Sequence, residues 1–372
     1  MNNNYQFQFG TLWSPEHFDG EVAFGNMQRA FAEAMAKYPD EVCESFYLFG
    51  EQKVRIRIVG RQLAQQIFRP FSHLQLRQPT HATPRLRIDL WDDNRAKANA
   101  NPRVQTTPAG LRWTEITAQS ADARFIGQHL PHTFSCLDRE TQHIIGAIAW
   151  HERIFIYERA KPLARLLLEW HNDQGMQIIH TGLVAQHGQG VLFAGKSGSG
   201  KSTTSLTCVC AGFDYLSEDY VGLERRHDGT FVGHSLYNSI FLESRHLRRF
   251  ADLMPHAIKG RLPEEEKSVI LLSQVFPEQL KRAVPIRALI LPRVADTPVP
   301  HMRAASKGEA LLALGPSSLL QIPNKGLGVQ GLDKLAQLVE RVPCYRLELG
   351  RDLSPIPSLV KDVIAELKDK DN

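Results

Sequence analysis

The chain has few cysteines and no long apolar run. Its 372 residues include five cysteines, Cys43, Cys136, Cys208, Cys210 and Cys344. This odd, sparse set contains no pair of ligand-spaced clusters, so we expect reduced thiols rather than a disulfide framework or a zinc site. No apolar run approaches the roughly 18 to 20 residues that span a bilayer, and the start, MNNNYQFQFG, lacks the basic and apolar regions of a signal peptide. We therefore expect a cytoplasmic protein without a membrane partner.

The chain also lacks a strong excess of one charge. Lys and Arg number 44 against 40 Asp and Glu, a formal net charge of +4 that is spread along the sequence. That is too weak to predict a nucleic-acid partner. The length and a hydrophobic content of 42% are sufficient for the cores of two domains, and there is no internal repeat.

Residues 1–160 carry the pattern of a mixed α+β domain. In SFYLFGEQKVRIRIVG, residues 46–49 and 54–59 lie on either side of Gly50, Glu51 and Gln52, and KVRIRIV alternates apolar with basic residues, which predicts a hairpin. A helical pattern follows as far as Pro70, and PRLRIDLWDD predicts another strand. No catalytic motif is recognisable there. If the basic strand of the hairpin lies at an exposed edge, it can pair with a peptide, so this domain is a candidate for docking a substrate or partner.

Residues 161–372 carry the pattern of an α/β domain. A helix is predicted in KPLARLLLEWHNDQG, then strands in MQIIHTGLVA and GVLFAG. A glycine-rich loop, a helix in KSTTSLTCVCAG and one strand in FDYLSEDYVGL follow. Strand, loop, helix and strand in this order begin a layered α/β fold. Further along, YNSIFLESRHLRRFADLM is partly helical in pattern, IRALILPRV and VPCYRLELG predict strands, and SPIPSLVKDVIAELKDK predicts a closing helix.

The glycine-rich loop has the spacing of a phosphate-binding loop. It comprises Gly195, Lys196, Ser197, Gly198, Ser199, Gly200, Lys201 and Ser202. Glycines allow the backbone N–H groups to close around phosphate oxygens, and the following helix turns its positive end toward the same charge. The lysine can bridge the β and γ phosphates of ATP, and the serine hydroxyl can bind Mg²⁺. Thr203 is either a further phosphate contact or an ordinary first-turn threonine.

Two adjacent acids, Glu218 and Asp219, follow the loop lysine closely. On a strand next to that of the loop, an acid would come close to the γ-phosphate. A kinase needs one carboxylate to accept a proton from the incoming hydroxyl and one to hold Mg²⁺. We expect Ser202 and Asp219 at the metal, with both acids and Lys201 as catalytic candidates. The alternative is a solvated acidic pair at a strand end.

Residues 178–223, from IIHTGLVA through the loop to SEDYVGL, resemble the core of the HPr serine kinase/phosphorylase family, whose fold is similar to that of phosphoenolpyruvate carboxykinase. The resemblance implies a P-loop kinase core of that type and a site role for His180, on the strand before the loop strand. In the family the first acid is usually aspartate and acts as the base, with the second near the metal. Glu218 departs from this pattern, so the roles of the two acids stay open. The Arg-Gly-Leu-Gly run of the bifunctional enzymes is absent.

The leading hypothesis is an ATP- and Mg²⁺-dependent kinase that phosphorylates a serine or threonine of a protein or a precursor peptide. A small-molecule kinase with the same site is one alternative. A P-loop ATPase or nucleotide switch is another, and a non-catalytic binding module is a third. The family resemblance also implies a homo-oligomer.

Overall fold

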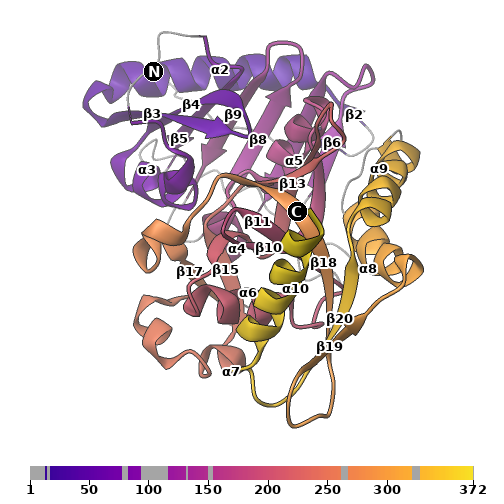
Figure 1. Ribbon diagram of the computed structural model, residues 1–372. Coiled ribbons are helices and arrows are strands. Elements are labelled where there is room, and N and C mark those ends of the chain that lie inside the picture. The colour runs from indigo at the N-terminus through magenta and orange to yellow at the C-terminus, as the bar shows by residue number, and fades with distance from the viewer. Residues whose placement is uncertain are drawn as a thin grey trace. The chain divides into compact units, whose positions relative to one another are not determined.

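The computed structural model describes residues 13–14, 17–77, 83–93, 116–130, 133–149, 154–260, 267–320 and 327–371. It divides into two compact units, which we describe separately (Figure 1). Unit 1 comprises Met1–Arg69 and Gln75–Leu167, and unit 2 comprises Pro70–Leu74 and Leu168–Asn372. Unit 2 therefore includes a short segment that lies far before the glycine-rich loop in the sequence.

Unit 1 is built on a seven-stranded sheet. In spatial order its strands are β3 (Val42–Phe49), β4 (Gln52–Val59), β5 (Leu86–Asp92), β9 (His143–Ile148), β8 (Thr133–Asp138), β7 (Phe125–Leu130) and β6 (Ile116–Gln119). The pairs β4–β5 and β5–β9 are parallel, and the other pairs are antiparallel. Among its described residues the unit also contains the short strands β1 (Trp13–Ser14) and β2 (His17–Phe18), the helices α2 (Gly20–Lys37), α3 (Arg61–Phe68) and α4 (Ile156–Ala160), the 3-10 turn η1 (Pro39–Glu41) and the first residues of α5 (Ala164–Asp173).

The hairpin predicted around Gly50 is confirmed as β3 and β4, and Gly50 has a φ of 59° at the turn. The expectation that its basic strand forms an exposed edge is wrong, because β4 lies between β3 and β5 and pairs with both. The parallel pairing with β5 uses the backbone groups that an added peptide would need.

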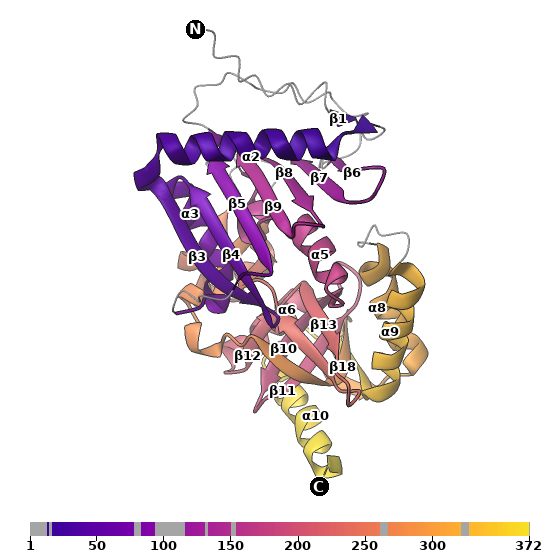
Figure 2. The same cartoon turned by 90° about the horizontal axis from the view of Figure 1, so that it is seen from above.

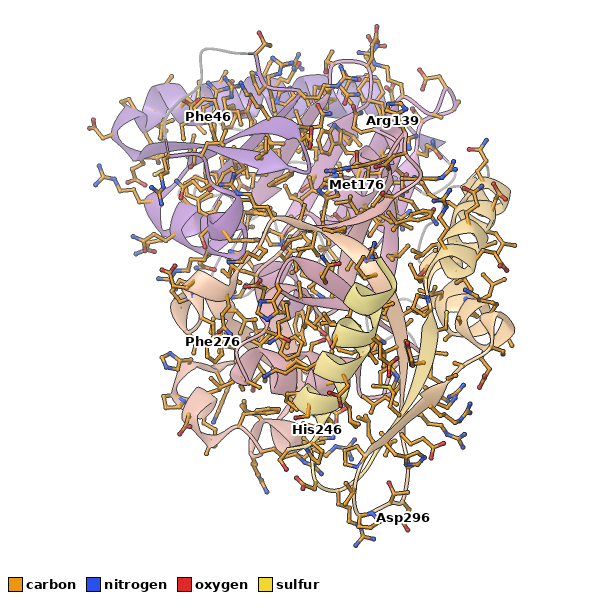
Figure 3. All side chains as sticks on the ribbon, viewed as in Figure 1. Phe46, Arg139, Met176, His246, Phe276 and Asp296 are labelled. Carbon is orange, nitrogen blue, oxygen red and sulfur yellow. The ribbon has the colours of Figure 1, made fainter. Side chains whose placement is uncertain are left out.

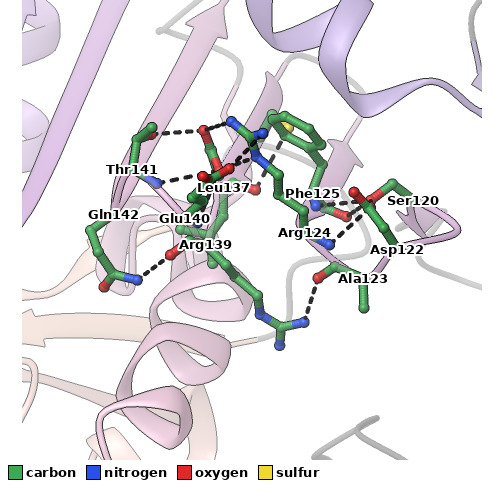
Figure 4. Close-up of polar contacts among 12 residues, drawn as sticks. Ser120, Asp122, Ala123, Arg124, Phe125, Leu137, Arg139, Glu140, Thr141 and Gln142 are labelled. Atoms are coloured by element: carbon green, nitrogen blue, oxygen red, sulfur yellow. Dashed lines mark hydrogen bonds and ion pairs between the residues drawn. The ribbon is translucent and has the colours of Figure 1, made fainter.

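Helix α2 packs across one face of this sheet, as Figure 2 shows. Its buried side chains, among them Met27 and Phe31, join sheet residues such as Trp91 and Ile145 in one hydrophobic core. At the β7–β8–β9 end of the sheet, the carboxylate of Asp138 accepts two hydrogen bonds from Arg124 at 2.9 and 3.0 Å (Figure 4). The Thr141 hydroxyl donates a third at 2.7 Å, which ties the turn after β8 to β7.

A buried polar group ties the middle strands of unit 1 together. Asp89 on β5 is 3% exposed. It accepts two hydrogen bonds from Arg57 on β4, both at 3.0 Å, and contacts Nε2 of His143 on β9 at 2.9 Å. Burial alone would raise the pKa of Asp89, but the hydrogen bonds from His143 and Arg57 outweigh it and lower that pKa. Phe31 of α2 covers the Arg57 guanidinium at 4.9 Å.

Unit 2 contains an eight-stranded sheet. Its strands are β10 (Gln177–Gln186), β11 (Gln189–Ala194), β12 (Asp214–Ser217), β13 (Tyr220–Arg225), β14 (Phe231–Ser235), β18 (Ala283–Val294), β19 (His301–Ala304) and β20 (Cys344–Leu349). The long strands β10 and β18 each pair with β11 along one part and with β13 or β14 along another. Since β13 also pairs with β14, these five strands close into a circuit.

Successive residues of β11 enter different cores on the two faces of this sheet. Val191 and Phe193 pack with α6 (Lys201–Cys210) and α10 (Ile356–Asp371), whereas Leu192 packs with α8 (Lys307–Leu320) and α9 (Leu327–Arg341). Figures 1 and 2 show α10 apart from the α8–α9 pair. A second, three-stranded sheet of β15 (Ser239–Glu243), β17 (Lys267–Leu271) and β16 (Ile258–Lys259) contributes to the α6 side, together with α7 (Ser244–Leu247). Phe276, labelled in Figure 3, packs against the same core.

The mixed α/β class predicted from the sequence is confirmed in both units, and one local prediction is wrong. The stretch 213–223 was expected to be one strand, but it forms β12 and β13 with a bend at residues 218 and 219. Its apolar residues fit one continuous strand as well as two, and pairing with β10 selected two. The stretch 237–254, expected to be partly helical, contains strand β15, the short helix α7 and the start of the 3-10 helix η5 (Ala251–His256), which confirms that prediction.

Within the residues that the structure describes, no helix combines the length and apolar content that crossing a bilayer requires.

Candidate functional site

The glycine-rich loop joins β11 to α6, as predicted. Helix α6 begins at Lys201, and Gly200 before it is left-handed with a φ of 103°. The left-handed backbone favours glycine here, and a Cβ atom at Gly200 would lie 2.2 Å from Cδ1 of Leu349 on β20, so the leucine side chain would have to shift. Lys196, Ser197 and Gly198 are exposed at the tip of the loop.

The loop lysine folds back over its own loop. Lys201 is 7% exposed, and its Nζ donates hydrogen bonds to the carbonyls of Gly195 at 2.7 Å and Lys196 at 3.3 Å. The Ser199 hydroxyl is buried without a hydrogen-bond partner in the described part of the chain. A positive helix end, an ammonium group and an unused hydroxyl all face one short loop, and this donor set fits phosphate oxygens.

Ser202 and Glu218 meet directly. The Ser202 hydroxyl donates a hydrogen bond to Oε2 of Glu218 at 2.6 Å, and Oε1 of Glu218 accepts the backbone N–H of Phe241 on β15 at 3.1 Å. Glu218 is only 4% exposed. Oxygen ligands of this kind, a hydroxyl and a carboxylate, suit Mg²⁺. The described residues hold no group of three or more His, Cys, Asp and Glu side chains able to bind a metal, and a Mg²⁺ bound largely by phosphates and water needs no such group.

Asp219 turns to a different partner. Its Oδ1 contacts Nε2 of His180 on β10, and the Asp219 side chain is 25% exposed against 12% for His180. The His180 backbone N–H donates to the Ser318 hydroxyl on α8 at 3.1 Å. The Asp219 backbone N–H donates to Oγ of Ser217 at 3.2 Å, which in turn donates to the Tyr220 carbonyl at 2.7 Å. Asp219 is therefore held at the surface of the site by its neighbours on both sides.

The bend between β12 and β13 separates the two acids. On one continuous strand Glu218 and Asp219 would alternate and point in opposite directions. In the structure the strand is interrupted between β12 and β13, and the two acids have different partners. The acid-bearing strand was expected beside the strand of the loop, and this is wrong, because β10 lies between β11 and β12. Burial, and then the charges of Glu218 and Asp219, raise the pKa of Tyr215 on β12, so its hydroxyl stays protonated and donates to the Ser239 carbonyl at 2.8 Å.

The structure thus places the candidates in two adjoining groups. Lys201, Ser202 and Glu218 form one, and His180 and Asp219 form the other. Thr203 is buried in the first turn of α6, where its carbonyl accepts a hydrogen bond from Thr207 at 2.8 Å. No sequence pattern indicated Ser318 or the Phe241 backbone, since both reach the site only through tertiary packing. Ser217 could have been suspected, because a serine directly before two acids often caps a bend.

Comparison with known proteins confirms the resemblance seen in the sequence. The chain is 30% identical over 138 residues to the HPr kinase/phosphorylase of Thermoanaerobacter sp. (strain X514), a match that covers 36% of this chain and 45% of the relative. It is 32% identical over 128 residues to the HPr kinase/phosphorylase of Caldanaerobacter subterraneus subsp. tengcongensis, covering 33% of this chain and 42% of the relative. The chain is therefore related to the HPr kinase/phosphorylases, although each match spans less than half of the relative's length.

Two other comparisons add little. No family model matches the chain. The solved HPr(Ser) kinase/phosphatase of Coxiella burnetii is 14% identical, with a TM-score of 0.32, over 52% of this chain and 94% of that one. At that score the structural likeness carries no argument.

Proposed function

We propose that the chain is an ATP- and Mg²⁺-dependent kinase that transfers the γ-phosphate to a serine or threonine hydroxyl of a protein or peptide. One observation carries the proposal: the two acids at the bend have separate partners, Ser202 of the phosphate loop for Glu218 and His180 for Asp219. Such a division matches the two tasks of a kinase site, which are to hold the metal and to accept a proton. The relationship to HPr kinase/phosphorylases supports the same reaction class.

The geometry favours a division of roles opposite to the one expected from the sequence. Glu218, rather than Asp219, lies on the Ser202 hydroxyl, so we assign Ser202 and Glu218 to Mg²⁺. Bound Mg²⁺ would neutralise charge that develops on the phosphates. Asp219 is the more exposed acid, with a side chain 25% exposed against 4% for Glu218, and it contacts His180. A partly exposed carboxylate beside an imidazole can accept the proton of an incoming hydroxyl, so we assign Asp219 as the base.

Lys201 and the loop supply the phosphate contacts in this proposal. The lysine already has its ammonium group among the loop carbonyls, and a short movement would bring it to a bound phosphate. The N–H groups at the start of α6 point along the helix axis toward the same place. These groups bind and orient the nucleotide before the acids act.

The proposal is tested by incubating the full chain with γ-labelled ATP, Mg²⁺ and candidate peptides and proteins, followed by mass spectrometry. Gain of a phosphate on a serine or threonine, lost in Lys201→Ala, supports it. A labelled metabolite with unlabelled protein would select a small-molecule kinase instead. Release of free phosphate at full rate without any acceptor would select an ATPase.

A further inference from the structure

A short segment from early in the chain is part of the unit that holds the site. Pro70–Leu74 belongs to unit 2, although residues 75–167 separate it in sequence from the rest of that unit. It forms most of the 3-10 turn η2 (Arg69–Leu74), in which Pro70, Phe71 and Leu74 are buried. The family resemblance in the sequence does not reach this segment.

Asn238 fixes the segment in place. It is fully buried, its backbone N–H donates to the Pro70 carbonyl at 2.9 Å, and its Nδ2 donates to the Ser72 hydroxyl at 3.1 Å. The backbone carbonyl of Asn238 accepts a hydrogen bond from the backbone N–H of Leu272 at 2.9 Å. Next to it, the rings of Phe71 and Tyr237 lie 5.2 Å apart. The segment is therefore anchored to the same chain region that leads into β15.

His73 makes the contact that matters for the site. Its Nε2 lies 2.7 Å from Oγ of Ser235 on β14, and that hydroxyl donates to the Leu216 carbonyl on β12 at 2.6 Å. A hydroxyl has one hydrogen, and this one is given to Leu216, so Nε2 of His73 must be the donor to Ser235. Burial, aided by the charge of Arg282, lowers the pKa of His73 to about 3, which keeps the imidazole neutral.

Ser235 contacts the chain on both sides of the bend that carries the acids. Its hydroxyl holds Leu216, two residues before Glu218, and its backbone pairs with Val221, two residues after Asp219. β12 pairs with β10, and its Tyr215 also bridges to Leu280, while the Leu216 carbonyl accepts the Ser235 hydroxyl. The His73 donor binds a lone pair of the same hydroxyl, which favours the orientation with the hydroxyl hydrogen toward Leu216. The geometry therefore links His73 to the position of the acid pair.

We propose that His73 is a positioning residue: by donating to Ser235, it fixes the bend that presents Glu218 and Asp219 to the phosphate loop. This inference rests on the proposed kinase function of the two acids. Its claim that His73 orders the bend can be tested on the protein without substrate. It makes a residue outside the motif region part of the machinery that orients the site.

The test compares His73→Gln, which keeps an uncharged donor close to the position of Nε2, with His73→Phe, which keeps a ring but has no donor. We expect His73→Phe to lower kcat about tenfold, as a small misplacement of a catalytic group does, with KM for ATP within about twofold. His73→Gln should stay close to the wild type. Ser235→Ala should lower kcat similarly, and the His73→Phe/Ser235→Ala double variant should be no worse than Ser235→Ala alone, because both act through one link.

Hydrogen exchange of the free protein, followed by mass spectrometry, supplies the readout that does not need turnover. Peptides that cover residues 214–222 should exchange faster in His73→Phe, while those of α6 should not. Ser72→Ala is the matched control, since it removes a hydrogen bond of the same segment without touching Ser235. If His73→Phe and Ser72→Ala change kcat and exchange equally, or if His73→Gln is as impaired as His73→Phe, the positioning role is wrong.

These results separate the two proposals. Absence of phosphate transfer by the wild type would contradict the proposed function, and the exchange data would still decide whether His73 orders the bend. Normal transfer in His73→Phe, with unchanged exchange at residues 214–222, would overturn the role of His73 and leave the kinase proposal intact.

Discussion

The hydroxyl of Ser202 and the carboxylate of Glu218 are joined by a hydrogen bond of 2.6 Å. Ser202 lies in the first turn of α6, directly after the phosphate loop, and Glu218 lies in a bend between two strands that the loop does not adjoin. A buried carboxylate at this distance from the loop serine is placed to share a cation with it. The neighbouring acid, Asp219, contacts His180, and the proposed reaction assigns it to proton transfer.

Lys201 should be indispensable to nucleotide binding and phosphate transfer. In Lys201→Ala the buried ammonium group is lost from the loop, and we expect phosphate transfer to fall at least about a hundredfold, as on removal of a charge-stabilising donor. Lys196→Ala is the matched control, because Lys196 is in the same loop but exposed, and it should cost no more than a few-fold. Initial rates with labelled ATP measure both. Equal rates for the two variants would contradict the assignment of Lys201.

Gly200 should tolerate no side chain. Gly200→Ala meets two costs, a left-handed φ of 103° and a Cβ only 2.2 Å from Leu349 Cδ1. Gly212→Ala separates them, since Gly212 also has a positive φ, 91°, but has open space around it. We expect urea unfolding to show a loss of about 1 kcal/mol for Gly212→Ala and clearly more for Gly200→Ala. Similar losses for both would show that contact with Leu349 is unimportant.

Asp89 should be a main source of stability in unit 1. Asp89→Ala leaves Arg57 and His143 without their shared carboxylate, and removal of one partner from a buried ionic group costs about 3–5 kcal/mol. Glu44→Ala is the control, because the Glu44 side chain is 43% exposed and only 3.8 Å from Arg55, and it should change stability by less than about 0.5 kcal/mol. Chemical denaturation monitored by circular dichroism compares them. A loss below 1 kcal/mol for Asp89→Ala would show that the network is not a significant contributor.

Because His73 is buried in its neutral form, we expect the stability of the fold to depend on pH. Its pKa is about 3 in the folded chain against an ordinary value of 6.5, so the unfolded chain binds the proton more readily. The contribution of His73 to the free energy of unfolding is therefore fully present above pH 6.5 and is lost progressively as the pH falls toward 3. One unit below the ordinary pKa the loss from this group is about 1.4 kcal/mol. We measure the free energy of unfolding of the wild type and of His73→Gln in urea at pH 7.5 and 5.5. The difference between the two proteins should change by about 1.4 kcal/mol between these pH values. A difference independent of pH would show that His73 is not held neutral.

The parts of the site that the sequence predicted depend on local spacing. The phosphate loop, the start of helix α6 at Lys201 and the hairpin at Gly50 all follow from residues that are close neighbours in the chain. The bend at Glu218 and Asp219 was missed because the apolar residues on both sides fit a continuous strand. Only pairing of β12 and β13 with separate parts of β10 shows where the strand is interrupted.

The roles of the two acids and of His73 depend on contacts between distant segments. Glu218 and Asp219 are adjacent and chemically similar, so no pattern distinguishes them; their partners Ser202 and His180 do. His73 lies in a stretch that the sequence places with the amino-terminal elements, and only the tertiary structure brings it to Ser235. Periodicity and motifs contain no information of this kind.

The assignment of Glu218 to the metal and Asp219 to the proton is tested most directly by titrating ATP, with and without Mg²⁺, into the wild type, Glu218→Gln and Asp219→Asn. We predict that Mg²⁺ strengthens ATP binding in the wild type and in Asp219→Asn, and that Glu218→Gln loses most of this gain. Asp219→Asn should bind Mg²⁺-ATP normally yet transfer no phosphate. Loss of the Mg²⁺ effect in Asp219→Asn with its retention in Glu218→Gln would contradict the account.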